Sequence, residues 1–119
     1  MLAAAEGTAQ TIRGKLRTGP KPALSLAEGA TVPLQGDPPT MQVLADGRLN
    51  GMDLEVAGRR DGSGPLQVGP IHTRAMKVLR EGKALMITYW CEVCSIRTYA
   101  PGICVCCQDE TALDLRESL

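Results

Sequence analysis

Residues 91–107 read Cys91-Glu-Val-Cys94-Ser-Ile-Arg-Thr-Tyr-Ala-Pro-Gly-Ile-Cys104-Val-Cys106-Cys107, and this stretch holds all five cysteines of the 119-residue chain. It contains two C-x-x-C pairs with nine residues between them. A tight turn lets both cysteines of a pair face one ion, and two turns that face each other complete a tetrahedron of sulfur ligands. The stretch therefore predicts a four-thiolate metal site made of Cys91, Cys94, Cys104 and Cys107.

The residues between the two pairs have a pattern of their own. Ile96 to Tyr99 includes β-forming residues, and Pro101-Gly102 is a turn dipeptide. This order predicts a short strand that leaves the first turn, reverses direction and returns to the second turn. Over about residues 89–109, the pattern resembles a zinc ribbon and, more loosely, the pair of cysteine knuckles in rubredoxin.

The resemblance implies one zinc ion per chain, with iron as the alternative metal. The chain departs from the usual knuckle because the glycine or proline often found in or after each C-x-x-C is missing. Glu92-Val93 and Val105-Cys106 fill the two turns, and Ser95 and Gln108 follow them. Because these glycines and prolines are missing, the sequence alone leaves the geometry of the turns and the identity of the metal open.

Other states of these cysteines stay open on the sequence alone. Disulfides would need an oxidising compartment. The thiols could also hold a transferable metal such as copper, or take part in redox chemistry. We interpret Cys106 as a small buried hydrophobic residue, with a spare ligand or a reactive thiol as the alternative.

His72 is interpreted as a loop residue with a backbone partner, since four thiolates already complete a zinc site; a metal ligand or proton acceptor is the alternative.

The composition limits the classes of function. The chain has 13 basic and 13 acidic residues, so no excess charge draws it to nucleic acid or to an anionic membrane. No stretch approaches the roughly 20 apolar residues of a transmembrane helix. The G-x-S-x-G, G-x-G-x-x-G and P-loop patterns are absent, and we expect no enzymatic activity.

Aromatic residues make up only 3% of the chain, so a metal site is a plausible source of stability that the core lacks. Tyr89, Trp90 and Tyr99 are all of them, and they flank the cysteines. We expect them to cover the apolar side of the metal segment. An exposed patch that binds a partner is the alternative.

The first half of the chain alternates apolar and polar residues over short stretches. Thr11–Arg17 has its apolar residues and a glycine on one face, which predicts a half-buried antiparallel strand. Leu24–Leu26 and Val32–Leu34 predict two shorter strands joined at Glu28-Gly29. The 13 glycines and 8 prolines also favour strands and turns over a helix bundle.

One short helix is expected in this half. Thr40 is the predicted cap, after a loop at Gly36–Pro39, and the helix covers Met41 to about Arg48. A strand through Met52–Val56 follows, because apolar and acidic residues alternate there. A turn at Asp61-Gly-Ser-Gly64 precedes a last short strand.

Two segments, Thr11-Ile-Arg-Gly-Lys-Leu16 and Gly51-Met-Asp-Leu-Glu-Val-Ala-Gly58, flank the hairpin and the helix. This arrangement resembles an OB-type barrel over about residues 8–72. The expected fold class is therefore mainly β: an OB-like small barrel with one short helix, followed by a C-terminal β hairpin extension of zinc-ribbon type. Small bacterial proteins are similar in both halves, but they bring no established activity to carry over.

The second half begins with a predicted hairpin. Arg74–Arg80 and Lys83–Trp90 pair around Glu81-Gly82, and the second strand runs into Cys91. The tail, Thr111 to Leu119, fits either a helical turn or a strand. The expected organisation is a flexible N-terminus at residues 1–8, the barrel at 9–72, and the hairpin with its four-cysteine ribbon and tail at 73–119.

The first residues, Met1-Leu-Ala-Ala-Ala-Glu6, have the small-residue character of a signal-peptide cleavage region. The charged and apolar regions that should precede such a site are missing. The stretch is either the remainder of a removed export signal or a disordered, alanine-rich start. We favour the first interpretation, and therefore an exported, periplasmic protein over a cytoplasmic one.

Three functions are compatible with these patterns. The favoured one is a non-enzymatic structural zinc module that docks onto a larger protein complex. A thiol redox, electron-transfer or metal-handling protein would use the same cysteines. Single-stranded nucleic-acid binding by the barrel is the third, but Arg13, Lys15 and Arg17 form only a short basic stripe.

Overall fold

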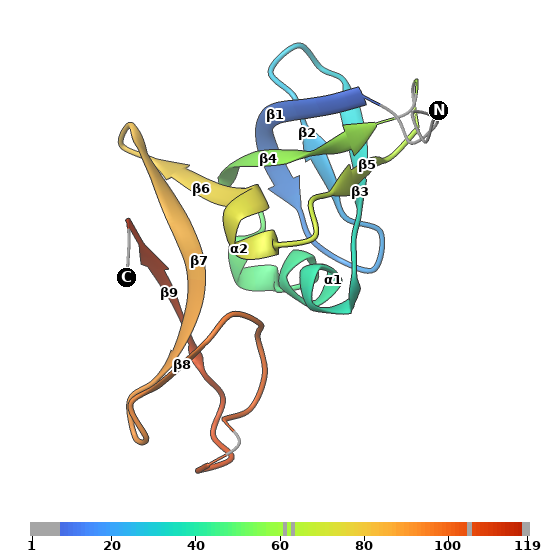
Figure 1. The fold of residues 1–119 in the computed structure, drawn as a ribbon. Helices are drawn as coiled ribbons and strands as arrows, with labels where there is room; N and C mark the ends of the chain where they lie inside the picture. The colour runs from blue at the N-terminus through green and yellow to red at the C-terminus, as the bar shows by residue number, and fades with distance from the viewer. Residues whose placement is uncertain (1–7, 61, 63, 105, 118–119) are drawn as a thin grey trace.

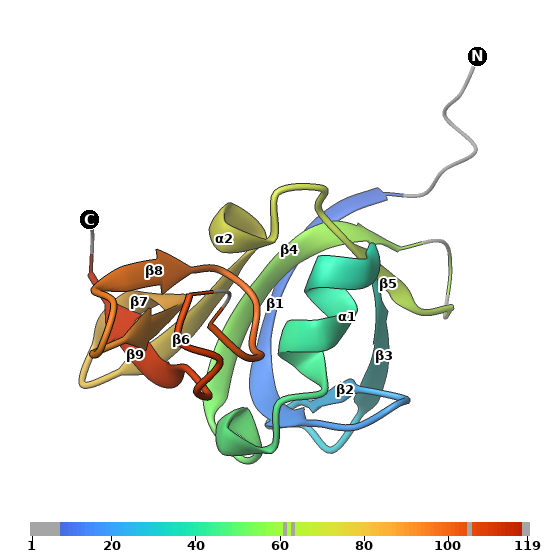
Figure 2. The same ribbon diagram turned by 90° about the horizontal axis from the view of Figure 1, so that it is seen from below.

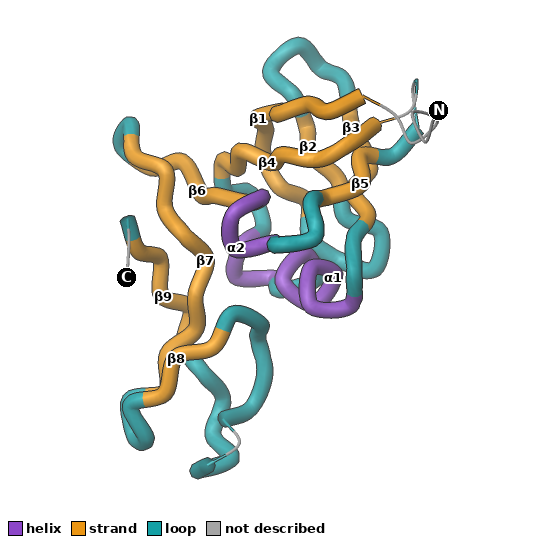
Figure 3. The backbone as a smooth tube through the Cα atoms, in the orientation of Figure 1, coloured by secondary structure: helices purple, strands orange, loops and turns teal. Residues whose placement is uncertain are grey.

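The computed structural model describes residues 8–60, 62, 64–104 and 106–117, which form nine strands and one helix of more than four residues. The strands are β1 (Thr8–Arg17), β2 (Ala23–Ser25), β3 (Thr31–Gln35), β4 (Asp53–Arg60), β5 (Leu66–Val68), β6 (Met76–Arg80), β7 (Lys83–Cys91), β8 (Ile96–Thr98) and β9 (Ala112–Arg116). The helical segments are α1 (Pro38–Leu44), the 3-10 turn η2 (Gly47–Leu49) and α2 (His72–Ala75). The protein is mainly β, as predicted (Figure 1, Figure 3).

Two predictions fall on parts of the chain that the structure does not describe. The flexible N-terminus and the signal-peptide interpretation concern residues 1–8, of which only Thr8, the start of β1, is described. Asp61 and Ser63 of the predicted turn before β5 also lie outside the described residues.

Strands β1 to β5 form a closed ring of pairings in the order β1-β2-β3-β5-β4, because β4 pairs back with β1. β3 and β5 are parallel, and the other pairs are antiparallel. The alternation expected for β1 and β4 directs Leu16, Leu54 and Val56 to the interior, where each is at most 1% exposed. Gly58 allows β4 and β5 to approach, since a Cβ atom there would lie 2.1 Å from the carbonyl oxygen of Gln67.

Helix α1 lies across one end of this ring (Figure 2). It begins at Pro38, so the predicted loop at Gly36–Pro39 and the predicted Thr40 cap are wrong. Asp37 is the cap, and its carboxylate accepts a hydrogen bond from the Thr40 backbone N–H at 3.0 Å. Proline suits the first turn because it has no N–H that would need a partner. The helix ends at Leu44, and η2 is a separate turn.

The sheet continues beyond the ring because β4 also pairs with β6. β6 and β7 form the predicted antiparallel hairpin, with Arg80 opposite Lys83. Arg74 does not belong to it, since the N–H groups of Arg74 and Ala75 bond to the Ile71 carbonyl and start α2. β7 pairs along one edge with β8 and along the other with β9, which resolves the tail as a strand. The domain boundary at residue 72 stays a prediction.

One cluster of buried side chains extends from the ring interior to β6 and β7, as far as Ile87 and Tyr89. Among the described residues after Cys91, only Cys104 and Thr111 are buried. In the described part of the chain, we find no helix with the length and apolar character needed to cross a membrane.

Candidate metal centre

The four predicted ligands gather at one point. The Sγ atoms of Cys91, Cys94, Cys104 and Cys107 all lie within 4.8 Å of one another, and those of Cys91 and Cys107 are 3.4 Å apart. A tetrahedron with metal–sulfur bonds of about 2.3 Å has sulfur–sulfur edges of about 3.8 Å. Cys91 and Cys104 are buried, and the other two are half-buried. The group therefore has the number of donors, the chemistry and the spacing that fit one tetrahedral metal ion.

Each cysteine pair lies at the tip of a hairpin, and the two hairpins match. Cys91 ends β7 and pairs with Ile96 of β8, so the first pair spans that tip. In the second hairpin, the N–H of Cys104 donates to the carbonyl oxygen of Asp109 at 2.8 Å. In both, the first cysteine faces the residue five positions later. The two tips lie beside each other at the lower end of the molecule (Figure 1).

The residues that follow the two pairs share an unusual backbone conformation. Ser95 has a φ of 53° and Gln108 has a φ of 67°. This is the left-handed region, which glycine enters readily and other residues enter at a cost of about 1–2 kcal/mol. Ser95 and Gln108 therefore adopt, without being glycine, the backbone conformation for which glycine is best suited. Strain of this kind persists only where the surroundings enforce it, which is typical of a functional site.

The hydrogen bonds within the second turn act on its thiols. The backbone N–H groups of Cys107 and Cys106 point at the sulfur of Cys104 and lower the pKa of Cys104 to about 7. A hydrogen bond with Cys106, together with burial, raises the pKa of Cys94. Because the thiolate is the form that binds metal, the lowered pKa favours Cys104 as a ligand.

Arg97 of β8 ties together the three strands that lead into the turns. Its Nη1 donates to Oδ2 of Asp114 on β9 at 2.8 Å and to Oγ1 of Thr88 on β7 at 2.7 Å. Its guanidinium lies over the ring of Trp90, 4.8 Å from the centroid. The hydrogen bond from Arg97 also lowers the pKa of Asp114. Arg97 therefore fixes the strand ends from which the ligands project.

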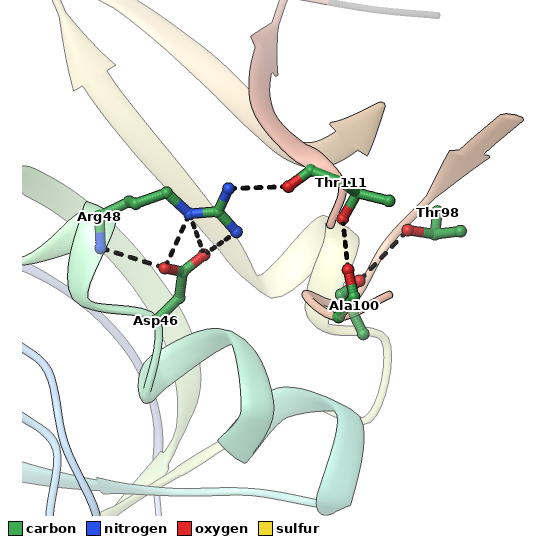
Figure 4. Close-up of polar contacts among 6 residues, drawn as sticks. Asp46, Arg48, Thr98, Ala100 and Thr111 are labelled. Carbon is green, nitrogen blue, oxygen red and sulfur yellow. Dashed lines mark hydrogen bonds and ion pairs between the residues drawn. The ribbon is translucent and has the colours of Figure 1, made fainter. Parts of the chain in front are cut away.

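A second arginine joins the ring to the second hairpin (Figure 4). Nη1 of Arg48, on η2, donates to the carbonyl oxygen of Thr111 at 2.9 Å, while its Nε and Nη2 contact the Asp46 carboxylate. Although burial would raise the pKa of Asp46, the hydrogen bonds from Arg48 hold it below its usual value. The cysteine spacing does not predict this hydrogen bond between the ring and the second hairpin, since Arg48 and Thr111 are 63 positions apart.

The three aromatic residues differ in their surroundings. Tyr89 is fully buried, and Arg48 lies over its ring at 5.3 Å from the centroid. Burial, with the nearby Asp46 carboxylate, raises the pKa of Tyr89. Trp90 is half-buried, and Tyr99 is 39% exposed. The core interpretation therefore holds for Tyr89 and is wrong for Tyr99.

The other candidate residues lie outside the four-sulfur group. Cys106 is exposed, so its interpretation as a buried hydrophobic residue is wrong. His72 is the first residue of α2, so its predicted position in a loop is wrong. Its Nε2 donates to the carbonyl oxygen of Tyr99 at 2.7 Å, which is the backbone partner expected for it. His72 is not among the donors that converge on the cysteine centre.

The basic stripe on β1 is partly neutralised by β4. Nη2 of Arg13 lies 2.7 Å from the Glu55 carboxylate, and Nζ of Lys15 lies 3.1 Å from that of Asp53. These pairs neutralise two of the three basic side chains of the stripe, which weakens its attraction for a phosphate backbone.

Comparisons of the chain with protein-family models, with curated proteins and with solved structures find no match. The convergence of four thiols is therefore the strongest pointer to function. It defines a cluster able to hold a metal ion and so indicates a metal-binding module.

Proposed function

We propose that this protein is a structural zinc-binding module, whose ion is held by Cys91, Cys94, Cys104 and Cys107. The observation that carries the proposal is the convergence of four sulfurs from two matched turns within 4.8 Å. Four thiolates at tetrahedral spacing are a usual donor set for structural zinc, and iron is the second metal that they suit.

The proposed module acts by binding rather than by catalysis. A four-thiolate site is closed, because it leaves no coordination position for water or substrate. Each hairpin also carries an exposed aliphatic side chain: Val93 is 72% exposed and Ile103 is 66% exposed. Large apolar side chains on rigid exposed turns suit contact with a protein partner, so we propose that the turns dock onto a larger complex.

We also infer that the ring of β1 to β5 is an OB-type barrel and that β7, β8 and β9 with the two turns form a zinc ribbon. The strand order β1-β2-β3-β5-β4, closed by β4 on β1, supports the barrel. So do the parallel pairing of β3 with β5 and the position of α1 between β3 and β4. The matched hairpins support the ribbon.

Native mass spectrometry of the protein as isolated, with elemental analysis of the same sample, tests the proposal. We expect one zinc ion per chain. Cys104→Ser should lose the metal, because it removes a buried ligand. Cys106→Ser is the matched control in the same turn, and it should keep the full metal content.

A metal-free protein whose mass is lower by the hydrogens lost in disulfide formation would contradict the proposal. Equal metal content in Cys104→Ser and in the wild type would also contradict it. Iron in place of zinc would give visible absorbance and would shift the function to electron transfer.

The position of Cys106 favours one second candidate, a metal-handling or thiol redox function. Cys106 is exposed and shares a hydrogen bond with Cys94, so a fifth thiol adjoins the centre. Such a thiol can attack the metal site and speed the exchange of its ion. The rate of zinc transfer to a chelator should then fall in Cys106→Ser, whereas a purely structural site predicts equal rates.

A further inference from the structure

A hollow lies on the ring, between β1, β4, β5 and α2, and its lining residues all precede Met76. We call it the α2 hollow. Its volume is about 600 Å³, within the range of about 300–1,000 Å³ for small-molecule sites. Figure 1 shows α2 beside β4, and the segment that leaves β5 and leads into α2. This segment carries Gly69, Pro70 and Ile71, which line the hollow.

The hollow is open because the residues around it are small. Ala57, Gly69 and Ala75 line it where α2 meets β4 and β5. A Cβ atom on Gly69 would lie 3.3 Å from the Cβ of Ala75, so the packing there leaves little room for a larger side chain. The space is thus set by the close approach of backbone segments, which suits a largely pre-formed site.

Most of the apolar surface of the hollow is offered by exposed and half-buried side chains. Ile71 is 53% exposed, whereas Val68 lines the hollow at only 4% exposure. An exposed isoleucine beside a hollow gives a bound apolar group more surface to cover. Burial of such surface stabilises a complex by about 25 cal/mol per Å² before the entropy of binding is subtracted.

The charged side chains in the lining have one sign. Arg59 and Arg74 both line the α2 hollow, and among its described lining residues none is acidic. The remaining polar side chains there include the amides of Gln10 and Gln67, which can donate hydrogen bonds. The combination of an apolar wall and the exposed guanidinium of Arg74 is complementary to an anion with an apolar body.

We propose that the α2 hollow binds a small amphipathic carboxylate, of the class of medium-chain fatty acids. The hydrocarbon chain lies on Ala57, Val68 and Ile71, and the carboxylate faces Arg74. The binding is independent of the metal centre, because no residue that lines the hollow belongs to either cysteine hairpin.

Sodium octanoate is the probe, titrated into the metal-loaded full chain and followed by backbone amide NMR. The amide signals of Gln67 and Ile71 should shift in a saturable way. Octanol should bind at least about threefold more weakly than octanoate, because it lacks the charge.

Arg74→Gln should weaken octanoate binding by about threefold and leave octanol binding unchanged. Ala57→Leu should weaken both by about tenfold, because it adds carbon atoms to the occupied space.

Arg17→Gln is the control, since Arg17 is an exposed residue of β1 outside the hollow, and its affinity should equal that of the wild type. Arg74 is exposed, so its variant tests the proposal even if Ala57→Leu does not fold. Equal affinities for octanoate and octanol, an unchanged affinity in Arg74→Gln, or binding of an apolar peptide but not of octanoate would each overturn the proposal.

Discussion

The ring and the cysteine hairpins are built on different physical principles. The ring encloses buried leucine and valine side chains, among them Leu16, Leu24 and Leu54, and each stabilises the fold by about 1.5–3 kcal/mol relative to exposure. In the described chain after Cys91, the only buried residues are Cys104 and Thr111. The segment after Cys91 thus has almost no apolar core of its own, although strand pairing makes it continuous with the ring. On the proposed function, one sheet contains a part that folds by apolar burial and a part that a bound metal ion stabilises.

The strongest test of this comparison is removal of the metal. With zinc chelated, we expect amide hydrogen exchange to become fast in residues 92–111 and to stay slow in β1 and β4. Structural zinc contributes on the order of 10 kcal/mol in small zinc domains, and among the described residues 92–111 only Cys104 and Thr111 are buried, so little apolar burial could replace it. Loss of protection in β1 and β4 at the same time would break the comparison, since it would make the ring dependent on the metal.

A core truncation in the ring is the converse test. Leu54→Ala removes a fully buried side chain and should lower the free energy of unfolding by about 2–5 kcal/mol in urea titrations. The zinc affinity of the folded variant, measured by competition with a chelator, should stay within about twofold of the wild type. Leu85→Ala, at a half-buried position on β7, is the milder control and should have a smaller effect. A large fall in zinc affinity in Leu54→Ala would show that the ring shapes the metal centre directly.

Ser95 and Gln108, whose backbone is in the left-handed region, test whether strain in the two turns weakens metal binding. Ser95→Gly and Gln108→Gly relieve strain at φ values of 53° and 67°, so each should raise the zinc affinity by about fivefold. Ser95→Ala keeps the strain and serves as the control, with little or no gain expected. If both glycine variants bound zinc more weakly than the alanine control, the left-handed conformation would not belong to the metal-bound state.

The smallest expected effect is a pH dependence of the stability that comes from Asp46, the carboxylate that contacts Arg48. The pKa of Asp46 lies below its usual 3.8 in the folded protein, so its carboxylate stabilises the fold above that pH. This contribution is lost as the pH falls through the lowered pKa. Asp46→Asn should therefore be less stable than the wild type at pH 6, and the difference should shrink below pH 3.8. Thermal unfolding of both metal-free proteins measures it, and a difference that does not depend on pH would contradict the assignment.

The sequence predicted the regions where the pattern is local. Alternation of apolar and polar residues found β1 and β4, because one face of each strand meets the ring interior. The C-x-x-C spacing found the four thiols, since two residues between ligands define a turn by themselves. The start of α1 was missed because Asp37 and the prolines after it act together as a cap and first turn, whereas each alone is typical of a loop.

The features that the sequence did not predict depend on distant partners. β9 is a strand because β7 offers it an edge, and nothing in its own residues decides between strand and helix. Arg48 meets Thr111 only after both regions have folded. The left-handed conformations of Ser95 and Gln108 are imposed by the turns around them, as neither residue type favours that region by itself.

The closure of the ring also has a consequence for the order of assembly during synthesis. Closure pairs Thr8 with Arg60 and Leu34 with Leu66, so the ring needs contacts between residues that are far apart in the chain and should form slowly. All of its strands nevertheless leave the ribosome before Cys91, and the last ligand, Cys107, comes later still. A nascent chain can therefore complete its slow, apolar step first, and the thiols then emerge next to a folded platform that limits their search for one another. Metal capture would then be the final event of folding, because its last ligand is the last part of the site to be synthesised.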